Sequence, residues 1–291
     1  MSMVPYNEVP IKGHVDFEYA LITAAPNMRK SCDIKGAVDG QNILQIEDGG
    51  SISNVIIDDP AKGIWCEGSC TLTNVLPIKG HVDFEYALIT AAPNMRKSCD
   101  IKGAVDGQNI LQIEDGGSIS NLIIDDPAKG IWCEGSCTLT NVFFTKTCYH
   151  AVDFGNSQDS SPKIYQVNGG AIFTQAGAGK TIIQNFCAEH FSKVWRSCGE
   201  YCFQHTRRVE MTNSKFKGPG LSLIGLNSNS HDTMYINNVK LDLSSPGISF
   251  GCQQYLGTQG AASSNPESEC LPEEECSKSS CNYKKGSIFV G

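Results

Sequence analysis

The sequence predicts an all-β protein and, within that class, a parallel β-helix. Two patterns lead to this prediction. Short segments with alternating apolar residues recur along the 291-residue chain, and each segment holds an asparagine at a similar place. The composition agrees, because 29 glycines, 12 prolines and only 19% charged residues are typical of a turn-rich globular chain. The length is sufficient for one large or two ordinary domains.

The recurring segments share the order apolar, any, Asn, apolar, any, apolar, or nearly so. They are Ser118–Ile124, Thr138–Phe144, Thr181–Ala188, Val209–Phe216 and Met234–Leu241, with Asn121, Asn141, Asn185, Asn213 and Asn238 as the shared residues and Asn168 as a sixth candidate. An alternation with a period of two is typical of strands. Strands that recur about every two dozen residues indicate coils stacked roughly 4.8 Å apart.

Asparagine suits the corner of such a coil because it tolerates left-handed backbone geometry and can hydrogen-bond to its counterpart in the next coil. On this basis the apolar positions that face one core are Ile119, Leu139, Ile183, Met211 and Ile236. An antiparallel sandwich is the alternative. It would need two-residue Asn-Gly turns between neighbouring strands, and such turns are scarce here.

A near-identical repeat occupies the N-terminal half. Val9–Val75 matches Leu76–Val142 at a shift of 67 residues, with differences only at the first position and at Val55, which corresponds to Leu122. Such closeness indicates a recent duplication or an assembly artefact. We predict three parts: a duplicated copy of the N-terminal coils at 1–75, the β-helix at 76–260, and a flexible tail rich in Cys, Ser and Glu at 261–291 with a final strand at Ser287–Val290.

Fourteen cysteines indicate an oxidising compartment, so we predict secretion although the N-terminus shows no signal peptide. The net charge of −8 disfavours nucleic acid and anionic membranes as partners, and we expect a monomer. A C-x₃-C pair occurs in Gly130–Val142, and Cys198 and Cys202 form another. Zinc ligation and disulfides between adjacent coils are both open, and we favour disulfides. We expect a turn at Gly130–Gly135 and a strand at Cys137–Phe144.

Four runs of sequence resemble the family 3 polysaccharide lyases, the small secreted pectate lyases of bacteria, fungi and oomycetes. They are GSISNLIIDDPAKGIWCEGSCTLTNVFF, YQVNGGA, GAGKTIIQNFCAEHFSKVWRSCG and LIGLNSNSHDTMYINNVK, and the resemblance covers about Cys99–Cys252. It implies a right-handed single-stranded parallel β-helix (solenoid), calcium as cofactor, and cleavage of the pectate (polygalacturonate) of plant cell walls by β-elimination.

The resemblance also implies which residues act. Lys193 and Arg196 in SKVWRSCG match the family's Lys-x-x-Arg pair and would serve as catalytic and substrate-binding cations, with Glu114 as a further substrate contact. In such chemistry a basic side chain with a lowered pKa takes the proton from C5 of galacturonate, while calcium draws charge from the adjacent carboxylate. Strict alternation would place Lys193 and Arg196 on opposite faces of a strand, but on one face of a turn or helical bend.

Several positions depart from the family pattern. Lys129 stands where active members carry Asp, Tyr149-His150-Ala151 replaces a Glu-Asp-Ala calcium motif, and Gly170–Thr174 replaces Asp-Lys-Val-Phe-Gln. Nearby acids are available to rebuild a calcium site or are simply solvated turn carboxylates. The predicted calcium ligands are Asp125, Asp126 and Asp153, with Glu134 and Asp159 nearby.

Three function classes therefore remain open: a working pectate lyase with a rearranged site, an inactive relative that binds pectin or the plant wall, and a purely structural β-solenoid. The family resemblance favours the first class, and the departures favour the second. A polygalacturonate assay with calcium or with a chelator would separate them.

Overall fold

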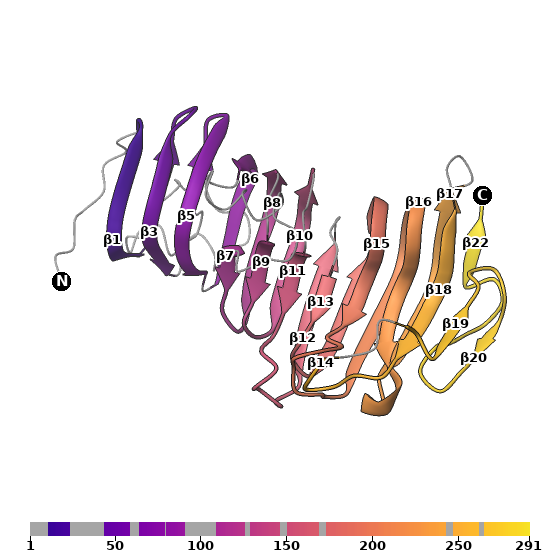
Figure 1. The fold of residues 1–291 in the computed structure, drawn as a ribbon. Coiled ribbons are helices and arrows are strands. Elements are labelled where there is room, and N and C mark those ends of the chain that lie inside the picture. Colours follow the sequence, from indigo (N-terminus) through magenta and orange to yellow (C-terminus); the bar gives the residue numbers. More distant parts are fainter. Residues whose placement is uncertain are drawn as a thin grey trace, which may run out of the picture. The chain divides into compact units, whose positions relative to one another are not determined.

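A computed structural model gives the fold (Figure 1). It describes residues 11–23, 44–58, 64–78, 80–90, 109–125, 129–145, 150–168, 173–242, 247–261 and 265–291. These fall into two compact units: unit 1 takes the described residues of 1–132 and 137–151, and unit 2 those of 133–136 and 152–291. Within the described residues, no helix has the length and apolar character required to span a bilayer.

Unit 1 is built from short strands that pair in parallel. They are β1 (His14–Thr23), β2 (Leu44–Ile46), β3 (Ser51–Asp58), β4 (Ile64–Cys66), β5 (Ser69–Ile78), β6 (His81–Thr90), β7 (Asn109–Ile113), β8 (Gly117–Asp125), β9 (Lys129–Cys133) and β10 (Cys137–Phe144). β3 pairs with both β1 and β5, β8 with both β6 and β10, and β2 with β4. Neighbouring strands in space are therefore separated by a full coil in sequence.

The two copies of the N-terminal repeat adopt the same local structure. β1 pairs with β3 from His14 opposite Ser51, and β6 pairs with β8 from His81 opposite Ser118, each with an irregularity at the equivalent point. The histidine Nδ1 lies 2.9 Å from the serine Oγ in the first copy and 2.8 Å in the second. Identical sequences thus form equivalent coils.

Unit 2, in its described residues, contains one 3₁₀ turn, η2 (Ser228–Ser230), and the longest of the described strands, β16, with 21 residues. Its strands are β11 (His150–Phe154, whose first two residues belong to unit 1), β12 (Lys163–Asn168), β13 (Phe173–Gln175), β14 (Gly179–Gln184), β15 (Cys187–Ser197), β16 (Arg207–Asn227), β17 (Thr233–Asp242), β18 (Ile248–Tyr255), β19 (Ser268–Cys270), β20 (Cys276–Ser277), β21 (Asn282–Tyr283) and β22 (Ile288–Val290).

Two parallel ladders share the long strand β16. Its first part pairs with β14 on one side and β17 on the other, while its second part pairs with β15 from Lys215 and with β18 from Gly220. A strand that serves one ladder and then turns into another is the geometry of a β-helix coil (Figure 1). The predicted parallel β-helix is confirmed, and the antiparallel sandwich is excluded as the main architecture.

The predicted core positions are confirmed in each unit. Ile119 and Leu139 are buried in unit 1, and Ile183, Met211 and Ile236 are buried in unit 2, all with at most 3% of their surface exposed. Unit 2 also stacks aromatic rings from coil to coil. Ring centroids lie 5.5 Å apart for Phe154 and Phe173 and 5.3 Å for Phe173 and Phe186, distances that favour ring–ring attraction.

The asparagine corners are also confirmed. Asn121, Asn141, Asn185, Asn213 and Asn238 all have positive φ, between 52° and 54°. The Nδ2 of Asn141 donates to the Oδ1 of Asn121 at 2.9 Å, and the Nδ2 of Asn238 donates to the Oδ1 of Asn213 at 2.8 Å. Asn168 differs, because it is the last residue of β12 and lies opposite Gln184, one residue before the corner asparagine Asn185 of the paired coil.

The cysteines depart from one prediction. Cys66–Cys70 and Cys198–Cys202 are disulfides, so two C-x₃-C pairs close local loops instead of linking adjacent coils, and their sulfurs are not zinc ligands. A three-residue spacer lets the chain reverse and bring the two sulfurs together. The turn expected at Gly130–Gly135 is also shorter than predicted, because Lys129–Cys133 is strand β9; Cys137–Phe144 is a strand as expected.

The C-terminal segment, which the composition indicates to be a flexible tail, packs against the preceding strands β17 and β18 of unit 2. β19 pairs antiparallel with β18, and β22 pairs with β17, which places a strand at the predicted Ser287–Val290. Cys252–Cys281 and Cys270–Cys276 link the segment internally and to β18, and Ile288 is buried. The segment therefore covers the last coil of unit 2 and pairs with one of its strand edges.

Candidate functional site

The predicted cations lie on one side of a bend in β15. Val194 and Trp195 are both fully buried, whereas Lys193 and Arg196 are half-buried. Two consecutive inward residues interrupt the alternation of the strand, so the cations that flank them emerge on the same outer side. The expectation that a strand would separate them is wrong for this reason: the segment is a strand, but it turns a corner of the coil.

The same corner occurs in the other coils. The burial pattern with two consecutive buried residues recurs in β7, β9 and β11, at positions that match Val194 and Trp195. In unit 2 the strand registers continue this alignment as a column that contains Asp153, Thr174, Arg196, Gly225 and Gln253 in successive coils. Arg196 is therefore two strand spacings, or roughly 10 Å, from the predicted calcium ligand Asp153.

Tyr255 at the end of β18 lies beneath both cations. The Lys193 Nζ is 5.3 Å from the centroid of the Tyr255 ring, and the Arg196 Cζ is 5.7 Å from it, within the range of cation–π attraction. Gly225 makes room for this arrangement. A Cβ at that position would lie 3.3 Å from the Lys193 Cδ and 3.6 Å from both the Arg196 Cγ and the Tyr255 Cε2.

A chain of hydrogen bonds holds the tyrosine ring. The Tyr255 hydroxyl donates to the Gln253 Oε1 at 2.9 Å, and the Gln253 Nε2 donates to the Glu269 Oε1 at 2.7 Å. Tyr255 and Gln253 are both buried, with 5% and 2% of their surfaces exposed. The platform under the cations is thus fixed from below by the last coil and by the C-terminal segment.

The electrostatics favour an anionic ligand. Burial, and next the neighbouring Arg196 charge, lower the pKa of Lys193. Burial raises the pKa of Tyr255, with a smaller opposing effect from Arg196 and a smaller supporting one from Glu269. Among the described residues, no acidic side chain forms an ion pair with Lys193 or Arg196. Two adjacent half-buried positive charges therefore lack an acidic ion-pair partner within the described part of the chain.

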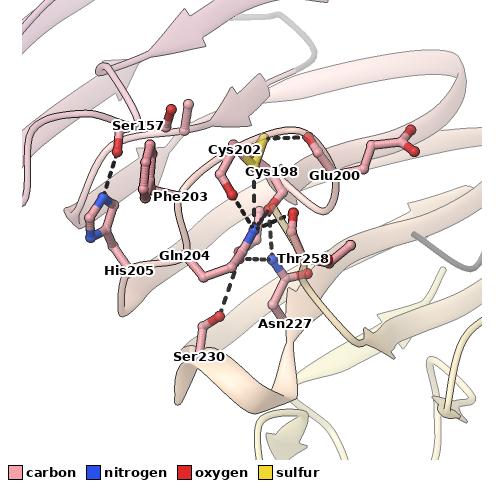
Figure 2. The surroundings of a disulfide bond; sticks show 12 residues. Ser157, Cys198, Glu200, Cys202, Phe203, Gln204, His205, Asn227, Ser230 and Thr258 are labelled. Atoms are coloured by element: carbon pink, nitrogen blue, oxygen red, sulfur yellow. Dashed lines mark hydrogen bonds between the residues drawn. A yellow bond between two sulfur atoms is a disulfide. The ribbon is translucent and has the colours of Figure 1, made fainter. Parts of the chain in front are cut away.

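A disulfide-closed loop follows Arg196 directly. Gly199 within the Cys198–Cys202 loop packs against the guanidinium, since a Cβ there would lie 2.8 Å from the Arg196 Nη2. Figure 2 shows the Gln204 amide beside this disulfide. Its Nε2 donates to the carbonyl oxygens of Cys198 at 3.2 Å and Cys202 at 3.1 Å. These bonds fix the loop that borders the cationic site.

The remaining predicted site residues do not lie beside Lys193 and Arg196 in the same strand. Glu114 lies in the turn between β7 and β8, and Asp125 ends β8, where its carboxylate accepts a hydrogen bond from the Thr145 hydroxyl. Both belong to unit 1, whereas Asp153 lies in β11 within unit 2. Asp126 is outside the described residues. Asp153 and Arg196 are thus aligned in the same column of unit 2, and Lys193 lies three residues before Arg196 on the same side.

A calcium ion bound by protein takes six to eight oxygen ligands, so a site should gather several acids. In the part of the chain that the structure describes, no three His, Cys, Asp or Glu side chains are grouped closely enough to hold a metal. The described carboxylates therefore do not fit a preformed calcium cage. Any ion would need ligands from the substrate or from undescribed positions such as Asp126.

Sequence reasoning missed the platform under the cations. Tyr255 ends the buried strand segment GCQQY just beyond Cys252, where the family resemblance stops, and nothing in its neighbourhood predicts a contact with β15. Gly225 did carry a signal: an isolated glycine within the apolar run LSLIGLN indicates a close approach by another group. That group is the pair of cationic side chains.

These features define a parallel β-helix protein with two cationic side chains over an aromatic ring at one corner of its coils. The chain belongs to the pectate lyase family: the family model described as pectate lyase matches residues 7–79 and again residues 78–262. The two matches divide near the boundary between the two copies of the repeat.

Named relatives agree. The chain is 31% identical over 225 residues to "Pectate lyase E" of Emericella nidulans, a match that covers 73% of this chain and 84% of the relative. It is 30% identical over 226 residues to "Probable pectate lyase E" of Neosartorya fischeri, which covers 75% of this chain and 83% of the relative.

Solved structures confirm the fold. Pectate lyase Pel3 from Pectobacterium carotovorum superposes with a TM-score of 0.57 at 19% identity, covering 74% of this chain and 67% of that chain. Pectate lyase PelI from Erwinia chrysanthemi gives a TM-score of 0.57 at 18% identity, covering 77% and 70%. PelI has also been solved in complex with tetragalacturonic acid, and that structure gives a TM-score of 0.51 at 19% identity, again covering 77% and 70%.

Proposed function

We propose that this protein binds polygalacturonate and cleaves it by β-elimination at the site around Lys193 and Arg196. One observation carries the proposal: these two half-buried cations lie side by side over Tyr255 without an acidic partner among the described residues. Unpaired charge in a partly desolvated place is costly unless a ligand neutralises it. A uronate carboxylate is a ligand of the required charge, and the family relationship supports this substrate.

The proposed chemistry divides the work between the two cations. Arg196 binds the uronate carboxylate, and neutralising that charge makes the C5 proton easier to remove. Lys193 in its neutral form takes the C5 proton onto Nζ, the electron pair forms the C4–C5 double bond, and the C4–O4 bond breaks. The departing oxygen then takes a proton from solvent or from the lysine ammonium. The lowered pKa of Lys193 favours this role because it increases the neutral fraction.

We propose calcium as a cofactor because of the family relationship. The predicted ligands are Asp125, Asp126 and Asp153, and their role remains a prediction. The substrate would have to supply further ligands, since the described acids form no cage. No step above depends on the ion. The family relationship likewise supports an extracellular location, where pectin of plant cell walls would be the substrate.

An assay for the unsaturated product tests the proposal. Wild-type protein, Lys193→Ala and Arg196→Ala would each receive polygalacturonate with calcium or with a chelator, and ultraviolet absorbance would follow the new double bond. Each variant should lower turnover about a hundredfold or more if Lys193 and Arg196 act as proposed. The exposed cation Arg208 on β16 supplies a control, Arg208→Ala, which should match the wild type. Turnover that survives the double substitution would contradict this site.

A second function has specific support. Lys129 and His150, which by the family resemblance stand where active members carry acids, begin β9 and β11, so these departures would fall within strands of the coil. A protein that kept only the cation pair would still bind pectate without cleaving it. In that case wild-type protein would retain polygalacturonate in a binding assay but form no unsaturated product, and the double substitution would abolish retention.

A further inference from the structure

We infer that Tyr201 forms a stacking subsite for a uronate ring of the polymer, next to the ring whose carboxylate Arg196 binds. This inference rests on the proposed function and extends it. Tyr201 has 74% of its surface exposed, a larger fraction than any other exposed large hydrophobic residue in the described part of the chain. Its position beside Arg196 is what points to a ligand for this ring.

The position follows from the loop that carries it. The Cys198–Cys202 loop starts two residues after Arg196, and Gly199 packs against the Arg196 guanidinium. Tyr201 is two residues beyond Gly199, so its backbone lies within two residue lengths, about 7 Å, of Gly199 and thus within about 11 Å of the Arg196 guanidinium. A sugar next to the one held by Arg196 is therefore within reach of a tyrosine side chain.

The loop is held rigidly, which matters for affinity. The Tyr201 amide donates to the Gly260 carbonyl at 3.1 Å, and the Thr258 amide donates to the Gly199 carbonyl at 3.0 Å. The disulfide and the Gln204 amide hold the ends of the loop (Figure 2). A ring whose backbone is already fixed loses little freedom when a ligand binds, so more of the contact energy appears as affinity.

The backbone of Tyr201 is also strained. Its φ is +54°, in the left-handed region that a bulky aromatic residue rarely adopts. Such conformations persist only where the surroundings impose them, and they are frequent at ligand sites. The Gly260 hydrogen bond and the disulfide impose this one, and the consequence is an aromatic ring presented to solvent.

The chemistry of the ring matches the polymer. A pyranose ring carries C–H groups on its faces and polar groups around its rim, and an aromatic face packs against those C–H groups while the phenol hydroxyl stays wet. Arg196 and Lys193 recognise the negative charge of a carboxylate, and every uronate unit of the polymer carries one. Tyr201 would recognise the sugar ring itself and would add affinity only for oligomers long enough to reach it.

Chain-length dependence provides the test. Isothermal titration would measure the affinity of digalacturonate and hexagalacturonate for wild-type protein, Tyr201→Ala, Tyr201→Phe and a control, Tyr235→Ala, which removes an exposed tyrosine of β17. Tyr201→Ala should weaken hexagalacturonate binding about fivefold to tenfold, the usual range for one aromatic contact, and leave digalacturonate binding unchanged. Tyr201→Phe and Tyr235→Ala should stay within about twofold of wild type for both oligomers, because the phenylalanine keeps the stacking face.

Each other outcome overturns the inference. Unchanged hexagalacturonate affinity in Tyr201→Ala would show that the ring is not a subsite, and an equal loss for both oligomers would show that the loop acts through Arg196. Both results would leave the proposed function intact, provided that Arg196→Ala still abolishes binding. Wild-type protein that binds neither oligomer would defeat the proposed function together with this extension of it.

Discussion

Replacing Tyr255 tests whether the aromatic platform holds the two cations in place. Tyr255→Leu keeps an apolar side chain but removes both ring contacts, to Lys193 at 5.3 Å and to Arg196 at 5.7 Å. Each such contact is worth about 0.5–2 kcal/mol, depending on how far it is desolvated, and these cations are half-buried. Losing both removes about 1–4 kcal/mol of contact energy that holds the cations in place, so the Kd for oligogalacturonate should rise, by at most roughly 700-fold.

Tyr255→Phe is the matched control. It keeps the ring and removes only the hydroxyl that donates to Gln253, so it should cost about 0.5–1.5 kcal/mol of folding stability and leave Kd within about twofold of wild type. Titration calorimetry gives Kd, and thermal unfolding shows that each variant folds. The reasoning fails if the two variants weaken binding equally, since the hydroxyl rather than the ring would then matter.

Three further predictions concern charge, packing and the repeat. Arg196→Gln should raise the pKa of Lys193, followed by NMR of the lysine side chain, because the neighbouring positive charge that helps to lower it is gone. In the wild type, stability should rise with pH between the lowered and the ordinary lysine pKa, because the unfolded chain binds that proton more tightly. Leu139→Ala should reduce the free energy of unfolding by about 2–5 kcal/mol in denaturant titrations through an unfilled cavity, and a cost under about 1 kcal/mol would contradict its core position. Deletion of residues 1–75 should leave the later coils folded by circular dichroism, because β6 pairs with β8 in the register that β1 uses with β3; cooperative unfolding of the truncated chain would show that the first copy is integral to the fold.

The sequence was most informative where local geometry and burial agree. Asn121 and Asn213 could be placed at corners because few other residues accept a left-handed backbone and also hydrogen-bond along a stack. Ile183 and Met211 could be placed in the core because strand alternation fixes which side chains face inward. Asn168 shows the limit, since it ends a strand one residue short of the corner position that Asn185 holds in the paired coil.

The site depended on information that is not local. Whether Lys193 and Arg196 share a face depends on two consecutive buried residues, and those are buried because the coil turns there. Tyr255 reaches the same place from a strand two coils further along, through registers that no spacing in the sequence predicts. The disulfide prediction failed for the opposite reason. Cys198 and Cys202 close a local loop, whereas the prediction from stacked coils placed the bonds between adjacent coils.

The arrangement around Tyr255 separates a ligand site from an ordinary charged surface. Glu269 is close enough to raise the pKa of Tyr255, yet it forms no ion pair with Lys193 or Arg196; its carboxylate instead accepts a hydrogen bond from Gln253. Glu269 orients the Gln253 amide and, through it, the Tyr255 hydroxyl. Because Glu269 does not neutralise Lys193 and Arg196, their charge remains available to a ligand. Elsewhere in unit 2 the cations Lys180 and Lys217 do pair with acids, at 2.6 and 3.4 Å. Among the residues that the structure describes, the absence of an acidic partner for Lys193 and Arg196 is therefore a local property of this corner, and an anionic polymer requires such unneutralised charge.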